Sequence, residues 1–230
     1  RDTFNLLLST LLLLIASLAG AQVEPEAREL FEKAREYHGG AALEAIEAYR
    51  DEGVLVTFGP EGEAVQENRF RTLIDLQGPR LRTELIAEGE LNLIQQLTPE
   101  GAFAWSEQVG ELPLTDEQVS ELRSALDIGI YGLIRGLDGA DSARHLGEIT
   151  IAGETGEAVE VVRDGRAVTL LFGEDGRLLA DRYPSSQLIE VETAYLRFEE
   201  HAGALLPVES EGHALGMRLL GSHVEWLAVN

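Results

Sequence analysis

The chain has 230 residues, with 18 Lys and Arg against 41 Asp and Glu, a formal net charge of −23 at pH 7. This charge argues against nucleic-acid binding, which rests on cations that neutralise phosphates, and against polybasic attachment to anionic lipid. The chain has no cysteine, which removes disulfides, thiolate metal sites and cysteine nucleophiles. A composition of 44% hydrophobic and 26% charged residues is that of a globular protein.

The first part of the chain has the pattern of an export signal. Residues 6–19 form an apolar run that is short for a transmembrane helix, which needs about 20 apolar residues. The run ends in Ala19-Gly20-Ala21, a small-x-small pattern typical of signal peptidase sites. We therefore expect a signal peptide over residues 1–21, cleavage between Ala21 and Gln22, and a protein that is soluble outside the cytoplasm. The alternative is an uncleaved membrane anchor.

Two helices are expected after the signal. Pro25 opens the first, since proline is tolerated in a first helical turn. Its apolar residues recur at three- and four-residue spacing: Leu30, Phe31, Ala34 and Tyr37. Gly39-Gly40 ends this helix, and a second, short helix is expected over residues 41–48.

From Gly53 onward apolar and polar residues alternate, which predicts antiparallel hairpins with one solvated face. Asp164-Gly165 and Asp175-Gly176 have the composition of two-residue hairpin turns. Because no composition break or repeat divides residues 22–230, we expect one α+β domain of roughly ten strands.

A longer helix is expected between two groups of strands. Thr115 followed by Gln118 is a capping box at its start. Its apolar side includes Leu122 and Leu126. Gly129 and Gly132 weaken the second half, so a kink or break is expected over residues 127–132.

The sequence offers no motif for catalysis or for a cofactor. GxSxG, GxGxxG and GxxxxGK[ST] are all absent, and the five histidines have no HExxH or HxxxH spacing. Surface or turn positions explain these histidines better than a metal site does. We therefore expect a protein that is not an enzyme and needs no metal or cofactor.

Three segments resemble the LolA/LolB-like superfamily of outer-membrane lipoprotein-sorting proteins. The first is His38-Gly39-Gly40, followed by a short helix and a strand. The second is Gly101-Ala102-Phe103-Ala104-Trp105, before the capped helix. The third is Ala202-Gly203-Ala204-Leu205-Leu206-Pro207-Val208 in a late hairpin. Their order along the chain carries the resemblance, which spans residues 22–230.

The resemblance implies a strongly curved antiparallel half-barrel of ten to eleven strands, covered by helices. It implies a periplasmic, monomeric carrier that shelters the acyl chains of lipids or lipoproteins, with an inner-membrane donor and an outer-membrane acceptor. The alternative is a sensory or regulatory lipid-binding module that relays the state of the envelope to a protein partner. The missing lipidated cysteine favours the soluble carrier over a membrane-anchored receptor.

The resemblance also implies two sets of site residues. We expect apolar side chains from the strands and the capped helix to line a shared cavity, with a closed, dry core as the alternative. These residues are Phe70, Ile74, Leu85, Leu93, Leu122, Leu126, Leu170 and Phe172. An arginine on an early strand ties down the helical lid in the classical carriers, and the candidates here are Arg69, Arg71 and Arg82. The alternative for Arg69 and Arg71 is a solvated strand face.

Overall fold

A computed structural model describes residues 22–230 apart from 79, 186 and 188. The expected signal peptide and most of its cleavage site lie outside the described residues. Four α-helices and a 3₁₀ turn are described: α2 (Pro25–Tyr37), α3 (Ala41–Glu44), α4 (Asp116–Ser124), η1 (Ala125–Asp127) and α5 (Gly129–Arg135).

The strands of the described chain form one sheet in the order β1-β8-β9-β10-β11-β12-β13-β14-β2-β3-β4-β5-β6-β7. Their bounds are β1 Gln22–Val23, β2 Ala48–Phe58, β3 Ala64–Asp75, β4 Arg80–Ala87, β5 Glu90–Thr98, β6 Gly101–Ser106, β7 Gly110–Leu112, β8 Ser142–Ile151, β9 Glu154–Arg163, β10 Arg166–Phe172, β11 Leu178–Pro184, β12 Glu190–His201, β13 Ala204–Ala214 and β14 Met217–Val229. The pairing is antiparallel except between β1 and β8.

This architecture confirms the α+β class, with helices few and strands many. The sheet has 14 strands rather than ten or eleven. Two of the additional strands, β1 and β7, are only 2 and 3 residues long. Strands of that length carry too few residues for alternation to be recognised in a sequence.

Helix α2 packs one apolar stripe against the sheet. Ala27, Phe31 and Ala34 are buried at helical spacing. The ring of Phe31 meets that of Phe172 edge to face, with centroids 6.3 Å apart. Burying an aromatic side chain of this size contributes roughly 1.5–3 kcal/mol, which anchors the helix to β10.

Two sequence predictions near the turns were wrong. The second helix ends at Glu44 rather than at residue 48, because Ala48 already pairs with Asp75 as the first residue of β2. The β10–β11 connection has five residues rather than two, closed by a hydrogen bond of 2.9 Å from the Gly173 N–H to the Arg177 carbonyl.

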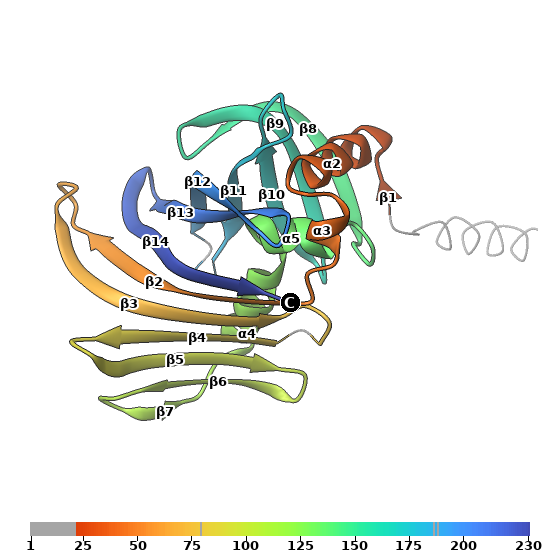
Figure 1. The fold of residues 1–230 in the computed structure, drawn as a ribbon. Coiled ribbons are helices and arrows are strands. Elements are labelled where there is room, and N and C mark those ends of the chain that lie inside the picture. The colour runs from red at the N-terminus through yellow and green to blue at the C-terminus, as the bar shows by residue number, and fades with distance from the viewer. Residues whose placement is uncertain (1–21, 79, 186, 188) are drawn as a thin grey trace, which may run out of the picture.

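The capped helix is broken as predicted. The Gln118 N–H donates to Thr115 Oγ1 at 3.3 Å and the Thr115 N–H donates to Gln118 Oε1 at 2.9 Å, which completes the capping box. Beyond η1, Ile128 is extended and Gly129 has φ of +54°, so α5 starts in a new direction. Figure 1 shows α4 and α5 in the middle of the molecule, with the long strands β2 and β3 drawn as arcs beside them.

Two of the motif segments meet in space. His38 is fully buried at the end of α2, where its Nδ1–H donates to the Leu205 carbonyl at 2.8 Å and its Nε2 accepts the Leu178 N–H at 3.0 Å. A Cβ on Gly39 would come within 2.9 Å of the Ala204 Cα, so glycine permits this approach. His38 is therefore a core residue that joins α2 to β11 and β13, and burial lowers its pKa.

Candidate functional site

A cavity of about 340 Å³ lies between the helices and the sheet. Its wall on the helical side is formed by Ala125, Ile128, Ile130 and Tyr131. The sheet supplies mostly apolar side chains from six consecutive strands: Tyr49, Asp51, Leu55, Phe70, Thr83, Leu85, Thr193, Tyr195, Pro207, Val208, Glu209, Ser210, Ser222 and Val224. We call this space the central cavity. Its volume and lining are those of a small-molecule site.

A second cavity, of about 560 Å³, lies where β2, β3, β4, β5 and β14 come together at one end of the sheet. Its apolar lining includes Ile74, Leu81, Leu97 and Val229. It shares Tyr49 with the central cavity. We call it the end cavity.

A third cavity, of about 470 Å³, is lined by four arginines, which we call the arginine pocket. Residues of α4, η1 and α5 form one side, and Leu97, Thr98 and Pro99 form another. The turn between β9 and β10 closes it. The pocket shares Leu97 and Thr98 with the end cavity, so the two spaces adjoin.

The structure distributes the eight expected lining residues among several places. Four of them line cavities: Phe70 and Leu85 the central cavity, Ile74 the end cavity and Leu126 the arginine pocket. Three belong to the packed core: Leu122, Leu170 and Phe172. The eighth, Leu93, lies on β5 opposite Leu85 of β4. The sequence missed the contribution of β12, β13 and β14 to the central cavity.

The central cavity contains a buried carboxyl group. Asp51 on β2 is only 6% exposed, and its Oδ1 has no hydrogen-bond partner among the described residues. Burial raises the pKa of Asp51 to about 6, although hydrogen bonds with Thr72 and Tyr49 favour the ionised form. The ring of Tyr49 meets that of Tyr131 on α5 edge to face at 5.1 Å. A buried titratable group therefore sits inside a largely apolar wall.

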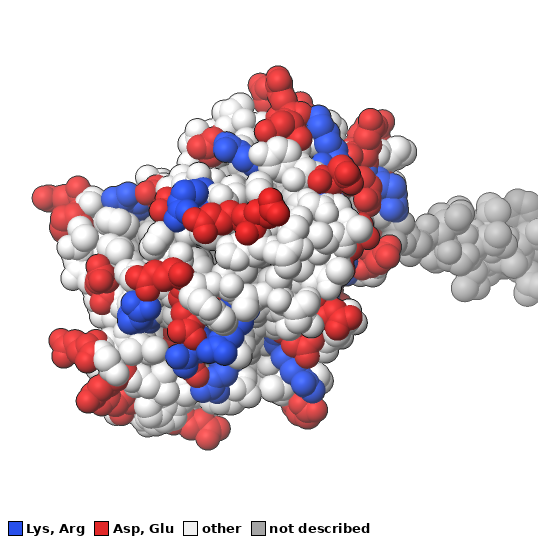
Figure 2. All heavy atoms as spheres, in the orientation of Figure 1, with Lys and Arg blue, Asp and Glu red and all other residues white. Residues whose placement is uncertain are grey.

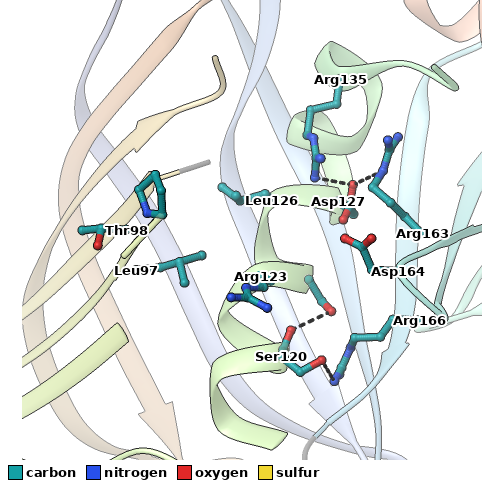
Figure 3. Close-up of a pocket in the computed structure, with 12 residues that line it drawn as sticks. Leu97, Thr98, Ser120, Arg123, Leu126, Asp127, Arg135, Arg163, Asp164 and Arg166 are labelled. Carbon is teal, nitrogen blue, oxygen red and sulfur yellow. Dashed lines mark hydrogen bonds and ion pairs between the residues drawn. The ribbon is translucent and has the colours of Figure 1, made fainter. Parts of the chain in front are cut away.

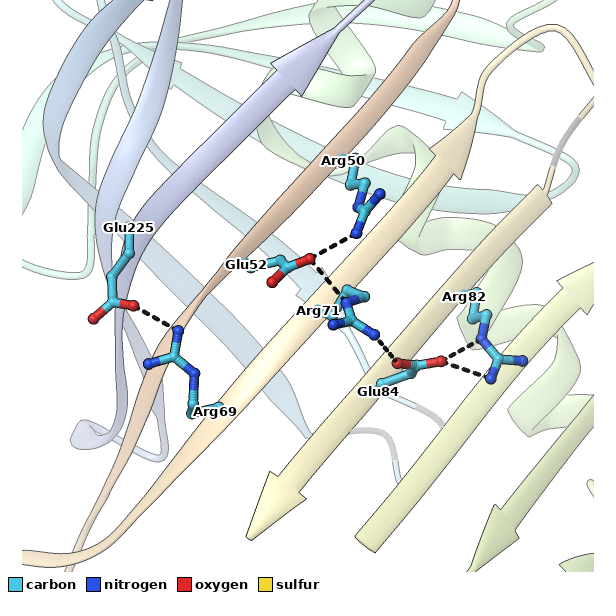
Figure 4. Close-up of polar contacts among 7 residues, drawn as sticks. All are labelled: Arg50, Glu52, Arg69, Arg71, Arg82, Glu84 and Glu225. Carbon is cyan, nitrogen blue, oxygen red and sulfur yellow. Dashed lines mark hydrogen bonds and ion pairs between the residues drawn. The ribbon is translucent and has the colours of Figure 1, made fainter. Parts of the chain in front are cut away.

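The three candidate lid arginines form ion pairs with glutamates of the sheet (Figure 4). Arg69 pairs with Glu225 of β14 at 2.6 Å. Arg71 bridges Glu52 at 2.9 Å and Glu84 at 3.1 Å, and Arg82 also pairs with Glu84 at 2.6 Å. Arg69 reaches past β2 to β14, Arg71 joins β3 to both neighbouring strands, and Arg82 pairs within β4. These contacts lie along the sheet, which fits the expected alternative of a strand face for Arg69 and Arg71. Partly exposed pairs of this kind contribute about 0–1 kcal/mol each.

A different arginine holds the helical segment to the sheet (Figure 3). Arg163 of β9 is 9% exposed and forms an ion pair with Asp127, with 2.9 Å between its Nε and Asp127 Oδ1. Arg135 of α5 donates a hydrogen bond to the same oxygen at 2.6 Å. The guanidinium of Arg163 further donates to the carbonyls of Asp138 at 2.7 Å and Gly136 at 2.9 Å, just past the end of α5. Arg163 therefore fixes both η1 and the end of α5.

Arg166 of β10 makes a second contact with the helical segment. Its Nη1 donates to Ser120 Oγ on α4 at 3.0 Å and its Nη2 donates to the Pro184 carbonyl at 3.0 Å. Sequence reasoning missed both arginines, although they flank the predicted Asp164-Gly165 turn. The signal available in the sequence was one arginine directly before and one directly after this turn.

No described helix is both long and apolar enough to cross a membrane. In the same part of the chain, no group of three or more His, Asp or Glu side chains is placed to hold a metal ion.

The comparisons with known proteins concern structure alone. No family model matches the chain. No curated protein matches its sequence. Among solved structures, a LolA superfamily protein from Nitrosomonas europaea aligns with a TM-score of 0.59 and 14% identity over 89% of this chain and 93% of that one. The chain has the LolA fold.

Two further structures agree on this fold. An outer-membrane lipoprotein-sorting protein domain from Vibrio parahaemolyticus aligns with a TM-score of 0.55 at 9% identity, and a DUF1329 family protein from Desulfovibrio piger with 0.56 at 12%. Each covers 89% of this chain and 93% of its own. The resemblance expected from the three motif segments is confirmed at the level of the fold, at low sequence identity.

Proposed function

We propose that this protein binds the acyl chains of lipids or lipoproteins in its central and end cavities and carries them across the periplasm. The observation that carries this proposal is the largely apolar central cavity between the helical segment and six neighbouring strands. Such a wall shelters a hydrocarbon chain without catalytic groups, since each methylene removed from water contributes about 0.8 kcal/mol.

The arrangement of the strands supports a half-barrel. Strands β12, β13, β14, β2, β3 and β4 are consecutive in the sheet, and all six contribute to one cavity under η1 and α5. A sheet that bends around a ligand in this way keeps its concave face partly unfilled. The LolA fold supports the same proposal, because two of its members are described as lipoprotein-sorting or LolA superfamily proteins.

A carrier also needs partners and a compartment. We propose export through the signal at residues 1–21, a donor at the inner membrane, an acceptor at the outer membrane and a monomeric mature protein of residues 22–230. The role is binding and release rather than catalysis.

Titration with a fluorescent acyl probe tests the proposal. Filling the central cavity with Leu55→Trp should weaken probe binding at least tenfold, while Val65→Trp, at a position 57% exposed on the neighbouring strand, should leave it unchanged. Equal affinity in both variants would contradict binding in the central cavity.

A second candidate function is the sensory module on the same fold. It is favoured by apolar residues exposed on the β13–β14 hairpin, outside the central cavity: Leu215 at 75%, Met217 at 43%, Leu219 at 38% and Leu220 at 39%. Exposed apolar groups of this kind mark contact surfaces. A vesicle-to-vesicle transfer assay separates the two functions, because a carrier alone moves a fluorescent lipid between vesicles and a sensor retains it.

A further inference from the structure

The arginine pocket is a locally cationic site in a strongly acidic protein. Four arginines and two aspartates line it, whereas the whole chain has 18 Lys and Arg against 41 Asp and Glu. Figure 2 shows acidic side chains spread over the visible face of the molecule, with basic ones interleaved among them. The arginine pocket therefore has more basic than acidic side chains, whereas the chain as a whole is acidic.

Two of the four arginines are occupied by structural contacts. Arg135 and Arg163 share the carboxylate of Asp127, and Arg163 also donates to two carbonyls beyond α5. These ion pairs and hydrogen bonds engage both guanidinium groups and hold the helical segment in place (Figure 3).

The other two arginines have no acidic partner. Within the described chain, no carboxylate lies within 4.0 Å of the guanidinium of Arg123 or Arg166. Arg166 donates to the Ser120 hydroxyl and the Pro184 carbonyl, but its Nε is buried without a hydrogen-bond partner there. A buried donor left unsatisfied costs about 1–3 kcal/mol.

The position of the pocket relates its charge to the apolar cavities. Leu97 and Thr98 line both the arginine pocket and the end cavity, and Tyr49 lines both the end cavity and the central cavity. The shared residues make the three spaces neighbours, with a cationic site at one end of the series and apolar walls in the rest.

We propose that the arginine pocket binds the anionic head, a phosphate or a carboxylate, of the amphiphile whose chain occupies the apolar cavities. This inference rests on the proposed function. Arg123 and Arg166 supply the charge-assisted hydrogen bonds, which are the stronger kind for such anions. The hydroxyl of Ser120 positions Arg166. Asp164 opposes the anion and limits its affinity.

Binding of probes with one chain length and different heads tests this assignment. Dodecyl phosphate, dodecanoate, dodecanol and inorganic phosphate are titrated into the full mature chain at one ionic strength. Both anionic amphiphiles should bind at least tenfold more tightly than dodecanol, and inorganic phosphate should bind far more weakly than dodecyl phosphate.

Variants of the pocket identify the groups responsible. Arg123→Gln, at an exposed site on α4, and Arg166→Gln should each weaken the binding of dodecyl phosphate on the order of tenfold. Neither variant should change the affinity for dodecanol. Arg28→Gln, which removes an exposed arginine on α2, is the charge-matched control and should change the affinity for neither probe. Asp164→Asn should strengthen dodecyl phosphate binding, and asparagine suits the positive φ of 51° at that turn position.

The outcomes separate this inference from the proposed function. Failure of the wild-type chain to bind dodecanol would contradict the proposed acyl-chain site itself. Two results would overturn the head-group assignment alone. One is that the wild-type chain binds dodecanol as tightly as the anionic amphiphiles. The other is that Arg123→Gln and Arg166→Gln bind dodecyl phosphate as tightly as wild type. Inorganic phosphate that binds as tightly as dodecyl phosphate would also overturn it, in favour of a free-anion site.

Discussion

The hydroxyl of Tyr195 on β12 donates a hydrogen bond to Oδ2 of Asp181 on β11, at the point where α5 begins. Asp181 is fully buried, and the Gly129 backbone also hydrogen bonds to its carboxyl. This contact joins the sheet to the first residue of α5, and burial raises the pKa of Asp181 to about 7.

The raised pKa of Asp181 predicts that folding favours its protonated form. Between the ordinary value of 3.8 and about 7 the native state binds more protons than the unfolded chain, so this group lowers the stability as pH rises through that window. Asp181→Asn should therefore gain stability relative to wild type as pH goes from 4 to 8, by on the order of a few kcal/mol. Urea unfolding at several pH values measures the difference.

Tyr195→Phe is the control for this prediction. It removes the hydrogen bond that lowers the Asp181 pKa and keeps the carboxyl. Its stability should fall more steeply than that of wild type above pH 6. A difference between Asp181→Asn and wild type that does not change with pH would show that the carboxyl is ionised in the native protein throughout.

Gly129 should not tolerate a side chain. Its φ of +54° is unfavourable for other residues, and a Cβ there would overlap the Tyr195 hydroxyl. Gly129→Ala should cost about 1–3 kcal/mol in the free energy of unfolding, or more where the overlap displaces α5. Gly147→Ala is the control, since Gly147 has a φ of +76° with nothing within 4 Å of the added Cβ. Equal losses in the two variants would mean that only backbone strain is involved.

Asp51 should make chain binding depend on pH. A hydrocarbon chain in the central cavity removes water from the carboxyl, and this penalises its ionised form. With a pKa of about 6, wild-type protein should therefore bind dodecanol more tightly at pH 5 than at pH 8. Asp51→Asn should bind with the same affinity at both values. Calorimetric titration measures this, and a pH dependence that persists in Asp51→Asn would assign it to another group.

The two kinds of arginine should differ in their effect on stability. Arg163→Met leaves the half-buried Asp127 with one partner fewer and frees two carbonyls beyond α5, so we expect a loss of about 3 kcal/mol or more. Arg71→Met breaks partly exposed pairs on the strand face and should cost about 1 kcal/mol or less. Chemical denaturation of both variants checks the ranking. A larger loss of stability in Arg71→Met than in Arg163→Met would contradict this ranking and favour an early-strand arginine as the residue that holds the helical segment.

Patterns within a few residues of each other were enough to predict many of the helices and strands. The capping box at Thr115 and Gln118 and the glycine at 129 predicted where the helical segment begins and breaks, because both act within a few residues. The alternation after Gly53 predicted antiparallel strands for the same reason. The end of the second helix was wrong because pairing of Ala48 with Asp75, 27 positions away along the chain, decides it.

The candidate site depends on contacts between distant segments. Arg163 meets Asp127 across 36 positions, and no local pattern selects that pair over Arg69, Arg71 or Arg82. Alternation placed Phe70 and Leu85 on the inner face, but it does not show that β12 to β14 close the same cavity. The packing of Phe172 against Phe31 rather than along a cavity follows from where α2 docks.

Native mass spectrometry of the protein purified from its own envelope tests acyl-chain binding most directly. We predict a mature chain with one bound molecule that carries an acyl chain and an anionic head, and loss of that molecule in Leu55→Trp. A spectrum with only the ligand-free mass, from protein that also takes up no added dodecyl phosphate, would contradict the account.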